Sequence, residues 1–209
     1  HASCFVCFQE QNLHFAPFSL SSLVANSYFF NSNYPLLGPK TQHFNDYFAL
    51  FSLVFHGYKR LYRMNKMLLV VDPQVDFISG SLPVKGAAEA MDALAEFVRV
   101  HGDEYAVKIV TSDWHPYHHS SFAEEGGQWP RHCVQHSSGA AIWETLLVAL
   151  NESKGGYTLL YKGDSIQKDE YSIMQNEESA GILNQLIRAL KIDQIDVCGL
   201  AGNICVLNT

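Results

Sequence analysis

The sequence has few basic residues, and this scarcity excludes one class of partner. Only 14 of the 209 residues are Lys or Arg, against 21 Asp and Glu, so the formal net charge is −7. Nucleic-acid binding needs clustered positive charge to neutralise phosphates, and we therefore expect no nucleic-acid partner. The chain also lacks a run of about 20 predominantly apolar residues, so we expect no membrane partner.

Cysteine is too scarce and too irregularly spaced for a disulfide framework. The five cysteines form an odd set, which favours a reducing compartment and predicts a cytoplasmic protein. A hydrophobic content of 47% over 209 residues suffices for one globular domain with an appendage. The cysteines are Cys4, Cys7, Cys133, Cys198 and Cys205.

The first 66 residues differ in composition from the rest. They hold 15 of the 26 aromatic residues but only two acidic ones, and residues 11–39 carry no charge at all. They have neither a sustained helical period nor the basic start and apolar centre of a signal peptide. We interpret residues 1–66 as a segment of doubtful order, read from upstream of a native start at Met64 or Met67. The alternative is a poorly packed extension or anchor, and the folded domain is predicted at 67–209.

From Met67 onward, apolar runs and helical periods alternate. Short apolar runs predict buried parallel strands, and they lie at 67–72, 106–111, 157–161 and 195–200. Apolar residues at helical spacing predict helices between them, at 87–100, 140–150 and around 182–190. This alternation predicts an α/β fold, a three-layer doubly wound sheet that is mostly parallel.

A His-rich segment follows the second predicted strand. Asp113 and His115 are two residues apart, which on an extended chain directs both side chains to one side. His132 follows after a glycine-containing loop, and His119 lies between them. One carboxylate and two imidazoles with open positions suit Zn²⁺, Mn²⁺ or Fe²⁺. The competing interpretation is a surface loop that happens to be rich in His.

Three more reactive side chains stand at carboxyl ends of predicted strands, where ligands of open α/β sheets bind. Asp72 ends the first strand, Lys162 follows the third and Cys205 follows the fourth. A carboxylate can accept the proton of a thiol, and an ammonium lowers the pKa of the thiol by favouring the anion. Together they predict an activated cysteine nucleophile, although each alone also fits a cap, a surface residue or a buried apolar group.

These residues stand in stretches that resemble the isochorismatase-like cysteine hydrolase superfamily and, within it, the nicotinamidase and pyrazinamidase family. The stretches follow the family's order at 71–77, 113–116, 129–135, 161–163 and 199–201 with 205–206, whereas residues 202–204 depart from the family's pattern. The family continues beyond its cysteine with further strand–helix units. We therefore expect a domain truncated at its C-terminus, with too few residues after Cys205 to form a helix.

The resemblance implies a cysteine amidohydrolase that converts nicotinamide to nicotinate and ammonia through a thioester. Asp72 would transfer protons, Lys162 would hold Asp72 and the thiolate, and Cys205 would attack the amide carbon. The backbone amides of Ala201 and Cys205 would form an oxyanion hole, and the resemblance implies a cis peptide bond before Ala201.

The resemblance also assigns the metal ligands and the substrate contacts. Asp113, His115 and His132 would bind a divalent metal, Zn²⁺ first and Mn²⁺ or Fe²⁺ as alternatives, completed by water or the intervening histidine. Phe77 and Trp129 would flank the ring of a small-molecule amide. The enzyme would serve NAD biosynthesis through pyridine nucleotide salvage.

Two alternatives stay open from the sequence. The chain could be another cysteine hydrolase of the superfamily, acting on a different small amide, or an inactive truncated fragment. The sequence does not determine the oligomeric state, and a homo-oligomer is compatible with it.

Overall fold

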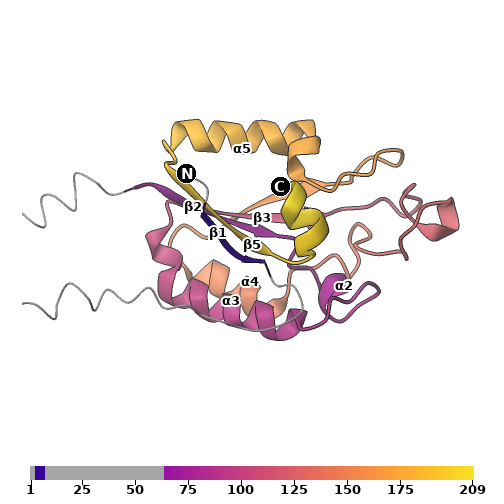
Figure 1. Cartoon of the computed structure of the whole chain (residues 1–209), viewed down its shortest axis with the longest axis horizontal. Coiled ribbons are helices and arrows are strands. Elements are labelled where there is room, and N and C mark those ends of the chain that lie inside the picture. Colours follow the sequence, from indigo (N-terminus) through magenta and orange to yellow (C-terminus); the bar gives the residue numbers. More distant parts are fainter. Residues whose placement is uncertain (1–2, 8–63) are drawn as a thin grey trace, which may run out of the picture. The chain divides into compact units, whose positions relative to one another are not determined.

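The computed structural model of the chain describes residues 3–7 and 64–209. Five parallel strands form one sheet in the order β1-β5-β2-β3-β4 (Figure 1). The predicted α/β class is therefore confirmed, and the described sheet is entirely parallel. The strands are β1 (Ser3–Cys7), β2 (Lys66–Val71), β3 (Val107–Asp113), β4 (Thr158–Lys162) and β5 (Gln194–Gly199).

Helices cover both faces of this sheet (Figure 1). α3 (Ala87–His101) and α4 (Glu144–Glu152) pack on one face, and α5 (Glu177–Ala189) packs on the other. The short helix α2 (Val75–Ile78) follows β2. The single-turn helices are η2 (Gly102–Glu104), η3 (Ala123–Glu125), η4 (Ile173–Gln175) and η5 (Gly202–Val206).

The central strand β2 explains why the three layers form. Its side chains alternate between the two faces, and both faces are apolar. Leu68 and Val70 pack into the core beneath α3 and α4, whereas Leu69 and Val71 pack into the core beneath α5. Because all four side chains are at least 97% buried, β2 can only be stable with a helical layer on each side.

One helix begins later than predicted. The sequence predicts a helix over 140–150, and α4 starts at Glu144. The preceding residues are bonded elsewhere: Ala141 O accepts from the N–H of Val75, and the Trp143 N–H donates to Pro73 O. These bonds tie the segment to the loop after β2, and that tertiary pairing outweighs its local helical preference.

The sheet has one strand more than the sequence analysis predicts. β1 lies in the N-terminal segment and pairs with β5, although no alternation pattern marks it. Residues 8–63 lie outside the described residues, so the interpretation of 1–66 as a non-native segment stays a prediction. Among the described residues, no helix has both the length and the apolarity needed to cross a bilayer.

The expectation that no helix follows the nucleophile position is wrong. η5 is a π-helical turn, and the next two residues continue in α-helical conformation. Ala201 O accepts hydrogen bonds from the N–H groups of Ile204 and Val206, at 2.9 and 3.3 Å. Cys205 and Val206 are buried in the core beneath α5. Tertiary packing therefore stabilises a turn that would be marginal in isolation.

Candidate active site

Lys162, the last residue of β4, lies at the centre of a cluster formed at the carboxyl ends of four strands. Its Nζ atom is 3.0 Å from Asp72 Oδ2 and 3.7 Å from Cys205 Sγ. The same ammonium donates a short hydrogen bond to Asp113 Oδ1. Lys162 is only 1% exposed, so these interactions are shielded from water. The structure thus brings the acid, the amine and the thiol of the sequence analysis into direct contact.

The two carboxylate oxygens of Asp72 have different partners. It follows β2 in left-handed backbone conformation, with φ 51°, and is fully buried. The Thr111 hydroxyl donates to Oδ1 at 2.6 Å. Oδ2 makes the ion pair with Lys162 but no hydrogen bond to any described residue. A buried carboxylate oxygen that faces only an ammonium retains lone pairs that can accept the proton of a neighbouring thiol.

The charges in the cluster stabilise one another. Burial opposes a charge on Lys162, but the carboxylates of Asp113 and Asp72 outweigh it and raise the pKa of the ammonium. Burial likewise opposes a charge on Asp113, but the Lys162 ammonium, followed by His115, holds the pKa of that carboxyl below its usual range. Lys162 and Asp113 are therefore a charged pair at neutral pH.

Cys205 is a resting thiol in this arrangement. Burial raises the pKa of the thiol well above its usual range, and Asp72 adds to the rise, while the Lys162 ammonium only partly offsets it. The ammonium lowers the thiol pKa as the sequence analysis expects, but burial, together with the carboxylates of Asp72 and Asp113, outweighs this effect. The thiol must therefore lose its proton as it attacks, and not before.

Asp113, His115 and His132 form a second cluster beside the first. One ligand atom from each lies within 4.8 Å of the other two, and all three residues are buried. His115 Nε2 is 3.6 Å and His132 Nε2 is 3.8 Å from Asp113 Oδ2. Two imidazoles and one carboxylate converging on a point form an arrangement suited to a divalent metal.

Hydrogen bonds to backbone carbonyls prepare both imidazoles as ligands. His115 Nδ1 is 2.9 Å from Gly163 O, and His132 Nδ1 is 2.7 Å from Pro130 O. A carbonyl can only accept, so each Nδ1 carries the hydrogen and each Nε2 keeps its lone pair for the metal. Burial also lowers the pKa of His132, which favours its neutral form. The residues therefore fit a divalent metal.

His119 does not join this cluster. Its ring lies 4.2 Å from that of His115, centroid to centroid, and it is fully buried. Its Nε2 is 3.1 Å from Lys168 O and its Nδ1 is 2.7 Å from Ser121 Oγ. Since the Lys168 carbonyl must receive a hydrogen, Nε2 has no lone pair to offer a metal.

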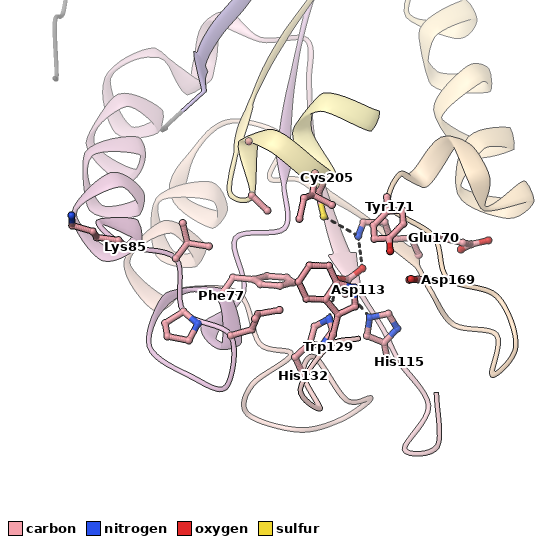
Figure 2. A pocket seen from close by; sticks show the side chains of 17 residues that line it. Phe77, Lys85, Asp113, His115, Trp129, His132, Asp169, Glu170, Tyr171 and Cys205 are labelled. Atoms are coloured by element: carbon pink, nitrogen blue, oxygen red, sulfur yellow. Dashed lines mark hydrogen bonds and ion pairs between the residues drawn. The ribbon is translucent and has the colours of Figure 1, made fainter. Parts of the chain in front are cut away.

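A cavity of about 410 Å³ opens onto both clusters. Lys162 lines it, and Cys205 lies at one side of it with His115 and His132 at another (Figure 2). Phe77 and Trp129, the predicted ring contacts, both line the cavity. Its other apolar walls are Leu82, Pro83, Val84, Tyr171, Ala201 and Ile204. A cavity of this volume with a few converging polar groups is typical of a small-molecule site.

The turn before Cys205 differs from its expected geometry. Every peptide bond in the described residues is trans, so the cis bond expected before Ala201 is absent. Ala201 instead has left-handed conformation, with φ 52° and ψ 55°, and caps η5. A non-glycine residue in this conformation costs about 1–2 kcal/mol, which marks the turn as a constrained part of the site.

A model of the isochorismatase domain matches residues 66–209. The chain belongs to the isochorismatase family. The nicotinamidase of Escherichia coli is 30% identical over 159 residues, covering 68% of this chain and 72% of that protein. The nicotinamidase/pyrazinamidase of Mycobacterium tuberculosis is 32% identical over 152 residues, covering 69% of this chain and 76% of that protein.

Solved structures of this isochorismatase family share the fold described above. The pyrazinamidase of Pyrococcus horikoshii in complex with zinc superposes with a TM-score of 0.58 at 31% identity, covering 68% of this chain and 74% of that chain. PnC1 from L. infantum in complex with nicotinate superposes with a TM-score of 0.62 at 34% identity, covering 70% of this chain and 72% of that chain.

Several lining residues of this isochorismatase-family site are absent from the sequence prediction. The loop at 82–85 forms one wall, and Asp169 and Glu170 line another. The only signals in the sequence are Gly80 and Pro83, which mark a loop but not where it folds. Loop walls depend on tertiary placement and have no periodicity of their own.

We predict that Gly163→Ala weakens metal binding. Gly163 has φ +66°, and a Cβ there would overlap the ring of His115. The substitution is expected to displace that imidazole and to lower Zn²⁺ affinity by about 10-fold or more, measured by calorimetric titration. Gly155→Ala is the matched control, because Gly155 has φ +81° but open space around its Cβ position. Equal affinities of the two variants would contradict the role of Gly163 in seating His115.

Proposed function

We propose that this protein is a nicotinamidase, an amidohydrolase that converts nicotinamide to nicotinate and ammonia. One observation carries the proposal: Lys162 contacts Asp72 at 3.0 Å and Cys205 at 3.7 Å, and Lys162 and Cys205 line a cavity that the Asp–His–His cluster also lines. Relatives named nicotinamidase, which are about 30% identical, support the choice of substrate.

In the first half-reaction, the Cys205 thiol attacks the carboxamide carbon. Its proton passes to Asp72 Oδ2, the buried carboxylate oxygen that pairs with the Lys162 ammonium. Lys162 keeps the Asp72 carboxylate and the developing thiolate in contact, since it touches both. The backbone amides of Ala201 and Cys205 are the groups we assign to the oxyanion of the tetrahedral intermediate. Asp72 then returns the proton to the nitrogen, and ammonia leaves a thioester.

In the second half-reaction, water hydrolyses the thioester. Asp72, again a carboxylate, accepts a proton from the attacking water, and the S–C bond breaks as nicotinate forms. The proton returns to Cys205, which restores the resting thiol. Each half-reaction uses the same acid, and no histidine acts as a base. The product nicotinate would place the reaction in pyridine nucleotide salvage, in the cytoplasm.

Asp113, His115 and His132 would hold a divalent metal, for which we propose Zn²⁺. A bound cation supplies a Lewis-acidic site for the ring nitrogen of the substrate. Two neutral imidazoles and one carboxylate match the usual ligand types of zinc, and the pyrazinamidase of Pyrococcus horikoshii was solved in complex with zinc. Phe77 and Trp129 would flank the ring from the cavity walls.

The proposed orientation of the substrate predicts a selective effect of His132→Ala. Losing one ligand is expected to lower kcat/KM for nicotinamide by about 10–100-fold, because the ring nitrogen loses its partner. Hydrolysis of benzamide, which lacks that nitrogen, is expected to change much less. Ammonia release from both amides by the zinc-loaded protein measures the difference.

His118→Ala is the matched control for this experiment. The His118 side chain is 70% exposed and pairs with Glu125 outside the cluster. The substitution is expected to leave the hydrolysis of both amides unchanged. A wild-type protein that releases no ammonia from nicotinamide would refute the proposed function. An equal loss for nicotinamide and benzamide in His132→Ala would refute the role of the metal in orienting the ring.

A further inference from the structure

The segment that begins at Asp72 contains two more polar side chains, one buried and one half-buried, which the mechanism above does not use. Gln74 and Asp76 follow the catalytic acid at alternate positions, at the start of α2. Gln74 is fully buried, although its amide offers two donors and an acceptor that all need partners. The partners of both side chains lie next to the metal-type cluster.

The Gln74 side chain makes hydrogen bonds to both the N–H and the carbonyl of Asp113. Gln74 Oε1 accepts from the Asp113 N–H at 2.8 Å, and its Nε2 donates to Asp113 O at 2.8 Å. Nε2 also donates to Ala140 O at 3.0 Å. The ladder between β2 and β3 pairs residues only as far as Val70 and Val110, so at Asp113 the chain of β2 has already turned away. The Gln74 amide thus replaces the peptide group that the ladder no longer provides.

Asp76 holds the backbone on the other side of the cluster. Its Oδ2 accepts from the Cys133 N–H at 2.7 Å. Cys133 directly follows His132 and has left-handed conformation, with φ 46°. Cys133 O in turn accepts from the His115 N–H at 3.0 Å. One residue held by Asp76 therefore connects the backbones of two candidate ligands.

We propose that Gln74 and Asp76 are positioning residues that build the metal site, Gln74 by orienting Asp113 and Asp76 by orienting His132 and His115. The Asp72–Gln74–Asp76 pattern would then combine one proton-transfer group with two supports for the metal ligands. Such supports commonly change metal affinity 10–100-fold when removed. The inference rests on the proposed function only through the metal site.

Two near-isosteric variants test this inference in the full-length chain. Gln74→Met keeps the length of the side chain but removes three hydrogen bonds, and Asp76→Leu keeps the shape of the side chain but removes the acceptor of the Cys133 N–H. Each is expected to lower Co²⁺ affinity by about 10-fold or more, measured by titration of the visible absorption of the bound ion. Competition with Zn²⁺ gives the corresponding zinc affinity.

Ser112→Ala is the matched control. Ser112 is buried beside Asp113, and its hydroxyl makes no hydrogen bond among the described residues. Its removal disturbs the same strand without removing a support, so we expect a Co²⁺ affinity within about twofold of the wild type. Asp113→Asn gives the effect of losing a ligand directly.

A purely structural role would give a different result. The melting temperatures of the metal-free variants would fall, but the affinity of the folded protein for Co²⁺ would match the wild type, and this outcome would overturn the inference. The titrations are made where circular dichroism finds each metal-free variant folded. Should Gln74→Met not fold, Asp76→Leu and the isosteric Gln74→Glu decide by the same criterion.

The Co²⁺ titration tests this inference independently of the proposed function, because it uses no amide substrate. A wild-type chain that binds Co²⁺ but releases no ammonia from nicotinamide would refute the nicotinamidase proposal and leave this inference standing if the variants bind weakly. A wild-type chain that binds no divalent metal would overturn the inference.

Discussion

Cys205→Ala is expected to abolish ammonia release from nicotinamide while leaving the fold and the metal site in place. The variant has no nucleophile to form the thioester, and removal of a nucleophile typically costs more than about 10³-fold in kcat. Cys205 is not among the candidate metal ligands, and its Sγ contacts Lys162 at 3.7 Å. Steady-state ammonia assays, with zinc content measured on the same sample, test both halves of this expectation.

Cys198→Ala is the control for the loss of a thiol. Cys198 lies on β5, within the sheet, and does not line the cavity. Its substitution is expected to retain activity. Undiminished turnover by Cys205→Ala would exclude the thioester mechanism, whatever the metal content.

Lys162→Met is expected to destabilise the metal-free protein and to remove activity. The ammonium separates two buried carboxylates, those of Asp72 and Asp113. Removing one partner from a buried ion pair typically costs about 3–5 kcal/mol, because the remaining charge has no compensation. Urea unfolding of the metal-free variant at neutral pH measures the loss, and ammonia assays are expected to detect no turnover.

The loss of stability in Lys162→Met is also expected to depend on pH. In the wild type the ammonium lowers the pKa of Asp113, so this interaction stabilises the protein above the ordinary pKa of a carboxyl and is lost as pH falls. The variant lacks this contribution, so the difference in unfolding free energy should be largest at neutral pH and shrink in acid. A constant difference would contradict the electrostatic explanation.

Arg99→Met is the control for the loss of a cation. Arg99 forms an ion pair with Glu96 on the exposed face of α3, where solvent screens the charges. Exposed pairs contribute about 0–1 kcal/mol, so little change is expected in stability or activity. An equally large loss in both variants would show that the position of Lys162 has no special importance.

The sequence was most informative about elements with a strong apolar pattern. The runs that became β2, β3, β4 and β5 were predicted to within about two residues at each end. Burial on both faces of a parallel sheet requires continuous apolar residues, so the pattern is visible without coordinates. β1 was not predicted although residues 4–8 form a short apolar run, because no alternating helix or strand pattern continues from it and its pairing with β5 is a tertiary contact.

The reactive residues were also visible in the sequence, since parallel strands bring their carboxyl ends to one edge of the sheet. Their tautomers and hydrogen-bond partners were not visible in the sequence. The tautomers of His115 and His132 follow from carbonyls at Gly163 and Pro130, and the bond of His119 to Lys168 removes it from the cluster. These partners come from distant or irregular segments.

The positions of the strands along the chain and the residue types at their ends, which are visible in the local sequence, thus determined which groups this protein can bring together. Protonation, the walls of the cavity and the supports at Gln74 and Asp76 depended on contacts between segments far apart in the chain. Electrostatic interactions and hydrogen bonds act over a few ångströms in space, whatever the separation in sequence, and therefore only the tertiary structure decided them.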